Sequence, residues 1–215
     1  MEKLFTFQET TKTKPLHYFG EDWSYEAALK EQLLAFSSVQ NDEAEFQILS
    51  GVHSPVYTIG NSIKKIPVSD SKVPFVKTDR GGQLMYHGPG QLTLYPVFNL
   101  KKTFAGPREY ANFVFDTVIE HFKKKHAIKL KCQQNGLWLK DKKVGFLGLR
   151  IKEGVAYHGL SLNYQADLAA FKKHSPCDII GDQAGNIFRT EDAKGLNLEF
   201  EACELSKALA LKLTI

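Results

Sequence analysis

Apolar and polar residues recur with two different periods along the chain, and each change of period marks an expected element. Alternating or β-rich runs predict strands over residues 15–20, 45–52, 56–59, 73–77 and 91–100, and residues 136–164 form three further pieces separated by glycines. A helical period predicts helices over residues 23–39, 107–125, 167–173 and 198–213. Helices and antiparallel strands mix without strict βαβ alternation, so we expect an α+β (α/β) fold.

Three of these patterns also predict which side chains are buried. In the first helix Asp22 is the expected N-cap, and the expected apolar stripe is Ala27, Ala28, Leu29, Leu33, Leu34 and Phe36. The helix opened by Pro107 has the expected stripe Tyr110, Phe113, Val114, Thr117, Val118 and Phe122. Ile128, Leu130 and Cys132 alternate with lysines, which predicts a half-buried strand with Cys132 on its apolar face.

The length of 215 residues fits one domain over 1–215, with a core of about residues 15–213 and a loose lead-in over 1–14. No apolar run approaches the roughly 18 residues of a bilayer span, and the N-terminus lacks the apolar core of a signal peptide. We therefore expect a cytoplasmic protein without membrane contact. The net charge of +4 is too weak to predict nucleic acid as a partner.

The three cysteines, Cys132, Cys177 and Cys203, include no C-x-x-C pair, so free thiols are expected. Cys177 follows Pro176 in a polar, turn-like run, which favours an exposed and reactive thiol. Cys132 and Cys203 fall in apolar-patterned elements, and we expect both to serve packing.

Several general motifs are absent: the chain has no P-loop, no dinucleotide fingerprint and no H-E-x-x-H. Ser161 lies in Gly-Leu-Ser-Leu-Asn, which lacks the second glycine of a nucleophile elbow. Three other runs stand out: RGGQLMYHGPGQLTLYP at 80–96, the Tyr-His-Gly triplet at 157–159, and HSPC at 174–177. By composition alone, the first run fits a polar site and a glycine-rich hairpin with one structural histidine about equally well.

These runs, together with residues 53–60 and 143–148, resemble the octanoyltransferases of lipoate synthesis over about residues 15–190. The resemblance implies the fold of biotin and lipoate protein ligases, with mixed and antiparallel sheets and flanking helices. It also implies transfer of an octanoyl (or lipoyl) group from acyl carrier protein, through an acyl-cysteine, to the lysine of lipoyl domains. The implied acceptors are the lipoyl domains of 2-oxoacid dehydrogenase complexes and the glycine cleavage H-protein, and no metal or other cofactor is implied.

The resemblance assigns the nucleophile to Cys177 and the cation and proton acceptor to Lys143, where composition alone would allow Lys142 as well. It also implies an acyl-binding set: Arg80, Gly81, Gly82, Gln83, Leu84, Met85, Tyr86, His87, Phe146, Leu147, Gly148, Gly159, Leu160 and Ser161. His87 and His158, with backbone N–H groups of the glycine-rich runs, are candidate oxyanion donors. As an alternative, His87 orders Tyr86 or its loop.

Two positions depart from the family pattern. Asp178 follows the nucleophile where glycine is common, and an inward-facing carboxylate there would raise the pKa of the thiol. Phe146 occupies a position that is usually small, so the acyl length is left open. Four other functions stay open: an ATP-dependent lipoate or biotin ligase, an octanoyl amidotransferase, a zinc module using His87, His158 and Cys177, and a non-catalytic module that binds carrier protein. The zinc module is the weakest, because the spacing of its ligands fits no common zinc motif.

Overall fold

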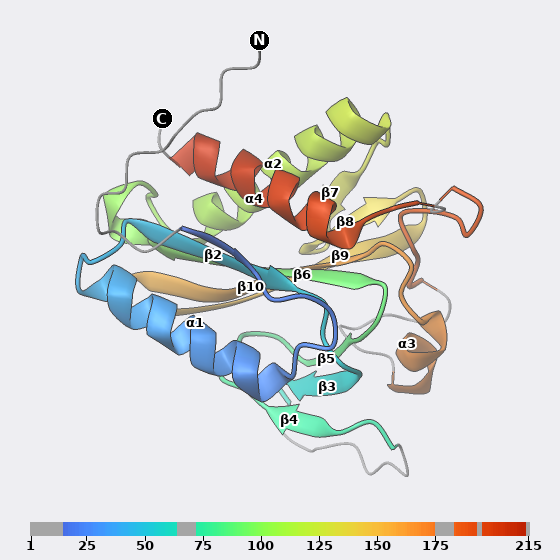
Figure 1. Cartoon of the computed structure of the whole chain (residues 1–215), viewed down its shortest axis with the longest axis horizontal. Helices are drawn as coiled ribbons and strands as arrows, with labels where there is room; N and C mark the ends of the chain where they lie inside the picture. Colours follow the sequence, from blue (N-terminus) through green and yellow to red (C-terminus); the bar gives the residue numbers. More distant parts are fainter. Residues whose placement is uncertain (1–14, 64–71, 175–182, 193–194, 214–215) are drawn as a thin grey trace.

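Two β-sheets and four α-helices form the fold, shown as a computed structural model in Figure 1, which describes residues 15–63, 72–174, 183–192 and 195–213. The expected lead-in over 1–14 lies outside these residues. The larger sheet has seven strands in the order β1 (Leu16–Tyr18), β2 (Phe46–Gly51), β6 (Gln91–Asn99), β10 (Val155–Asn163), β9 (Lys142–Lys152), β8 (Gly136–Leu139) and β7 (Lys131–Gln133). Only β1 and β2 pair in parallel in it. The smaller sheet has the order β4 (Phe75–Lys77), β3 (Val56–Ile59), β5 (Leu84–His87).

The helices cover both faces of the larger sheet (Figure 1). α2 (Pro107–His126) and α4 (Leu198–Leu213) pack on one face over the main apolar core. α1 (Tyr25–Gln40) packs on the other face, and α3 (Leu168–His174) packs against the smaller sheet. A short 3₁₀ helix, Leu100–Lys102, follows β6. Within the described residues, no helix combines the length and apolar character that a membrane span requires.

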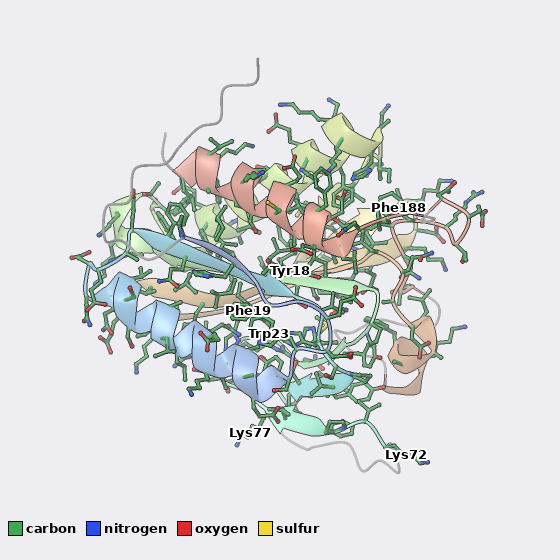
Figure 2. All side chains as sticks on the ribbon, viewed as in Figure 1. Tyr18, Phe19, Trp23, Lys72, Lys77 and Phe188 are labelled. Atoms are coloured by element: carbon green, nitrogen blue, oxygen red, sulfur yellow. The ribbon has the colours of Figure 1, made fainter. Side chains whose placement is uncertain are left out.

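Side chains at the end of β1 fix the entry to α1. Phe19 stacks on Trp23 with ring centroids 4.4 Å apart, and Trp23 stacks on His53 at 5.3 Å. Figure 2 shows Phe19 and Trp23 close together beside the start of α1, while Lys72 and Lys77 lie on the outer side, near β4. This aromatic stack ties the helix to the sheet at the end where the candidate site lies.

The expected strands and helices all occur, and the meander over 136–164 and the terminal helix over 198–213 are confirmed. The buried face of α1 was predicted only in part, since Ala28 and Phe36 of the expected stripe are buried and the rest are not. Its N-cap is Ser24, whose Oγ accepts a hydrogen bond from the Ala27 N–H, instead of Asp22. Leu33 and Leu34 are 46% and 57% exposed. The buried side chains are Tyr25, Ala28, Gln32, Ala35, Phe36 and Val39.

The packing role expected for two cysteines is also wrong. Cys132 lies in β7, an edge strand of three exposed residues, and Cys203 lies on the outward side of α4, so both thiols are exposed. The alternation holds only before the strand: Leu130 is buried in the main core and Ile128 packs against it, whereas Cys132 lies beyond them on the exposed edge strand.

The glycine-rich run contains a strand that the sequence did not predict. β5 pairs with β3 in the smaller sheet, whereas the next strand, β6, pairs with β2 and β10 in the larger sheet. Residues 88–90 therefore carry the chain from one sheet to the other instead of closing a hairpin. The seam between the two sheets is where the predicted site residues gather.

Candidate active site

Two neighbouring hollows lie at this seam. An outer groove of about 720 Å³ is lined by Lys143, by β9 and by residues of α2. An inner cavity of about 50 Å³ lies between β5, β9 and β10. Five residues line both: Gly81, Gly82, Phe146, Leu147 and Gly148. The groove and the cavity therefore adjoin each other along the strand that carries Phe146.

Lys143 is a buried ammonium in the outer groove, 8% exposed. Its Nζ lies 5.4 Å from the centroid of the Phe146 ring. Its aliphatic stem lies over Gly136, where a Cβ atom would stand only 2.4 Å from Lys143 Cε. Lys142, by contrast, is a half-exposed side chain 3.9 Å from Asp141. The geometry thus separates two lysines that composition left equivalent.

The backbone of Lys143 holds a distant segment in place. Its N–H donates to the carbonyl of Gln183 (2.7 Å), and the N–H of Gly185 donates to its carbonyl (3.0 Å), which forms a parallel bridge to Ala184. Cys177 lies outside the described residues, six positions before Gln183. Gln183, six positions after Cys177 in the sequence, therefore lies beside the strand that carries Lys143.

Arg80 braces the glycine-rich run against β3. Its Nη2 donates to the carbonyl (2.8 Å) and Oγ1 (2.9 Å) of Thr58, its Nε donates to the same Oγ1 (3.2 Å), and Nη1 donates to the carbonyl of Gly81 (3.0 Å). A side chain at Gly60 would not fit here, because its Cβ would lie 2.3 Å from the carbonyl oxygen of Gly82. The guanidinium thus fixes the loop that lines both hollows.

His87 is a neutral histidine within a hydrogen-bonded chain. Its Nδ1 lies 2.7 Å from Gln91 Oε1, and the Gln91 amide donates to the carbonyl of Tyr86 (3.1 Å) and to Asn163 Oδ1 (2.9 Å). Since the Gln91 amide nitrogen is used in this way, Nδ1 carries the imidazole proton and Nε2 is an acceptor. Burial, with the nearby His53 and Arg80, holds the pKa of His87 well below its ordinary value.

His158 has its own partner and an unusual backbone. Its Nε2 lies 2.8 Å from Asp79 Oδ1, and its N–H donates to Gln32 Oε1 (3.0 Å). Its φ of 58° is left-handed, rare for a residue other than glycine and a form of strain that gathers at functional sites. Burial lowers the pKa of His158. Burial alone would raise the pKa of Asp79, but hydrogen bonds from His158 and Tyr157 hold it below its ordinary value.

His53 joins this polar cluster from the side of α1. Its Nδ1 lies 2.8 Å from the carbonyl of Trp23, so Nδ1 carries the proton, and the Tyr95 hydroxyl donates to Nε2 (2.7 Å). Burial lowers the pKa of His53 to about 4. Within the described residues, the three histidines therefore support the cavity walls as neutral groups.

Most of the expected acyl-binding residues meet at the two hollows. The inner cavity is lined by Arg80, Gly81, Gly82, Met85, His87, Phe146, Leu147, Gly148, His158, Gly159, Leu160 and Ser161, and Gln83 lines the outer groove. Leu84 and Tyr86 alternate away from the cavity, into the apolar core of the smaller sheet. The inner cavity also has three lining residues that sequence reasoning missed: Tyr25, Thr93 and Tyr95. Thr93, a polar residue between Leu92 and Leu94, was the one visible signal.

Comparison with known proteins gives a consistent result. The family model described as "Lipoyl protein ligase A/B catalytic domain" matches residues 22–196. An octanoyltransferase of Shewanella oneidensis is 34% identical over 149 residues, 68% of each chain. One from Pseudoalteromonas translucida is 33% identical over 187 residues, 85% of this chain and 84% of the relative.

Solved structures share the fold at low sequence identity. A lipoate-protein ligase A bound with ATP has a TM-score of 0.63 at 11% identity and covers 92% of each chain. The biotin protein ligase of Aquifex aeolicus with biotin and ATP has a TM-score of 0.59 at 15% identity, over 94% of this chain and 71% of the ligase. The expected architecture of mixed and antiparallel sheets with flanking helices is thereby confirmed.

Proposed function

Because the chain belongs to the octanoyltransferases of the lipoyl protein ligase A/B catalytic domain family, we propose an acyl-cysteine mechanism for it, with Cys177 as nucleophile and Lys143 as its base. The enzyme transfers octanoyl groups in protein lipoylation, and lipoyl domains are its acceptors. We further propose octanoyl-acyl carrier protein as the donor. The acceptor lysines belong to lipoyl domains of 2-oxoacid dehydrogenase complexes and to the glycine cleavage H-protein.

One observation carries the assignment: Lys143 is a buried cation in a groove that adjoins a cavity lined by the glycine-rich run. Six residues of chain span at most about 20 Å, so the bridge from Lys143 to Gln183 limits how far Cys177 can lie from the groove. A cation beside a thiol favours the thiolate, which is the nucleophilic form. The pair therefore supplies both the nucleophile and the proton acceptor.

The reaction proceeds in two balanced steps. The Cys177 thiolate attacks the donor thioester, a new C–S bond forms, and the carrier thiolate leaves with a proton from the Lys143 ammonium. The neutral amine of the acceptor lysine then attacks the acyl-cysteine. Its excess proton passes to Lys143 as the amide bond forms, and Cys177 leaves as thiolate. Lys143 thus ends each cycle as the ammonium with which it began.

We assign His87 and His158 a positioning role instead of the oxyanion role. Each neutral imidazole has one N–H, and in both residues it faces an acceptor within the protein: Gln91 Oε1 for His87 and Asp79 Oδ1 for His158. Backbone N–H groups of the glycine-rich runs then donate the hydrogen bonds that stabilise the oxyanion. This agrees with the alternative reading in which His87 orders its own loop.

A mass measurement of the acyl-enzyme tests the mechanism. Incubated with octanoyl-acyl carrier protein and no ATP, the protein should gain one octanoyl group. Cys177→Ser should gain none, and Lys143→Ala should acylate on the order of 10²-fold or more slowly. Lys142→Ala is the matched control and should acylate at the normal rate. Full turnover by Cys177→Ser would refute the mechanism.

Two further arms separate related activities. A requirement for ATP would indicate a ligase, and transfer from an octanoylated lipoyl-type protein instead of the carrier protein would indicate an amidotransferase. Binding of carrier protein without any acyl-enzyme would indicate a non-catalytic module.

A further inference from the structure

The end of the inner cavity away from Lys143 is polar. Thr93 on β6 and Ser161 on β10 are directly paired across the two strands, and both line the cavity. They are 1% and 2% exposed. Among the described residues, neither hydroxyl oxygen has a hydrogen-bond partner. Two buried hydroxyls without partners are unexpected, because buried hydroxyls in proteins are nearly always hydrogen-bonded.

Strand register places this pair relative to the catalytic end. Ser161 pairs with Thr93 on one side and with Phe146 on the other, and Phe146 pairs in turn with Gly136. Directly opposed residues share a face of the sheet, so the four positions form one row. Thr93 is two strand spacings, about 9.6 Å, from the strand of Phe146. An acyl chain entering beside Lys143 therefore passes Phe146 before it reaches the hydroxyls.

The cavity is large enough to satisfy both hydroxyls with water. Its volume is about 50 Å³. A site needs only about 10–15 Å³ of such volume and two or more polar partners to hold a water molecule. Thr93 and Ser161 provide two partners at the spacing of a cross-strand pair. The site is thus both polar and roomy enough for ordered water.

We propose that Thr93 and Ser161 hold ordered water at the closed end of the acyl pocket and so set the longest acyl chain that the enzyme accepts. This inference rests on the proposed function. A chain of about eight carbons leaves the water in place. A longer chain must displace it and leave both hydroxyls buried without partners.

Competition between octanoyl- and decanoyl-carrier protein tests the proposal, with the acyl-enzyme mass as readout. The double variant Thr93→Val, Ser161→Ala removes both hydroxyls with little change in volume. Each methylene that enters an apolar site strengthens binding about fourfold. A decanoyl chain has two more methylenes than an octanoyl chain, so the decanoyl-to-octanoyl ratio of acyl-enzyme should rise by about 15-fold. Each single variant should give a smaller rise. The control Thr117→Val removes a buried hydroxyl that donates to the Phe113 carbonyl on α2, and it should leave the ratio unchanged.

Two outcomes decide the proposal separately from the proposed function. If the unaltered enzyme forms octanoyl-enzyme but the double variant keeps the original ratio, the chain-length inference is wrong and the function stands. A crystal structure supplies a readout that needs no activity: water should lie within hydrogen-bond distance of both Thr93 Oγ1 and Ser161 Oγ. A dry pair of hydroxyls overturns the proposal.

Discussion

Gly136→Ala should displace the Lys143 side chain while leaving both proposed catalytic residues unsubstituted. The new Cβ would lie 2.4 Å from Lys143 Cε, whereas ordinary contacts begin at 3.4 Å, so the Cε atom must withdraw by 3.4 − 2.4 = 1.0 Å. The carbonyl oxygen of Gly145, at 2.9 Å from the same Cβ, restricts the opposite adjustment. A displacement of about 1 Å at a catalytic group costs on the order of 10²-fold in rate.

The assay is the single-turnover rate of acyl-enzyme formation, measured across pH. We expect Gly136→Ala to acylate about 10²-fold more slowly. Its rate profile should also shift to higher pH, because a displaced cation favours the thiolate less. A purely structural effect would not move the pH profile.

Gly145→Ala is the matched control. It lies on the same strand as Lys143, and its Cβ would crowd Leu137 Cβ and Leu162 Cδ2, each at 2.9 Å, in the main core. This variant should lose thermal stability and keep the original pH profile. If folded Gly136→Ala acylates at the normal rate with an unchanged profile, the position of Lys143 does not matter and the reasoning is refuted.

Three further predictions follow from other contacts. Burial alone would raise the pKa of Glu201, but its close contacts with His126 and Lys125 and the nearby His121 ring lower that pKa to about 2. The contribution of Glu201 to stability should therefore be full above about pH 5 and lost as the pH falls toward 2. Glu201→Gln should cost about 3 kcal/mol at neutral pH and flatten this acid dependence, measured by urea unfolding at several pH values. Phe146 stacks on Phe171 with ring centroids 5.5 Å apart, so Phe146→Ala should cost about 3–5 kcal/mol of unfolding free energy. The smaller side chain should also raise the decanoyl-to-octanoyl ratio. An unchanged ratio would show that Phe146 does not restrict the path of the acyl chain. Thr58→Val removes the hydroxyl that accepts two hydrogen bonds from Arg80, so it should lower the free energy of unfolding by about 1–3 kcal/mol. Denaturant unfolding measures this loss, with Thr117→Val as a comparison for the loss of a buried threonine hydroxyl elsewhere.

The helices and strands whose burial follows from their local sequence pattern could be predicted. The three strands of the meander, β8, β9 and β10, follow one another along the chain with glycine punctuation, and α4 has an apolar stripe of Ala202, Leu205, Leu209 and Leu213. The buried face of α1 was not predictable, because Gln32 is buried by accepting the N–H of His158, a residue 126 positions away. The local pattern favoured Leu33 and Leu34, and it contains no information about that partner.

The candidate site divides in the same way. Its glycine-rich run was visible in the sequence, since unusual residue types cluster there, whereas composition left Lys142 and Lys143 equivalent and only the family resemblance selected Lys143. The imidazole roles were not visible, because they depend on Gln91 and Asp79 and on which nitrogen faces each. Thr93 and Tyr95 enter the cavity only through the register of β6 against β10. Pairing between distant strands decides such contacts, and no short motif records it.

The pairing of β6 with β10 also bears on how the enzyme folds. Leu92 lies opposite Leu162, 70 positions later, whereas Gly148 lies opposite Gly159, only 11 positions later. Contacts between distant positions form more slowly than local ones, so we expect the meander bearing Lys143 to form before β6 joins it. A folding intermediate with the meander formed but β6 unpaired would have Lys143 on a complete strand and would lack the acyl pocket. The yield of acyl-enzyme in a refolding time course would then count only chains that have closed the β6–β10 pair.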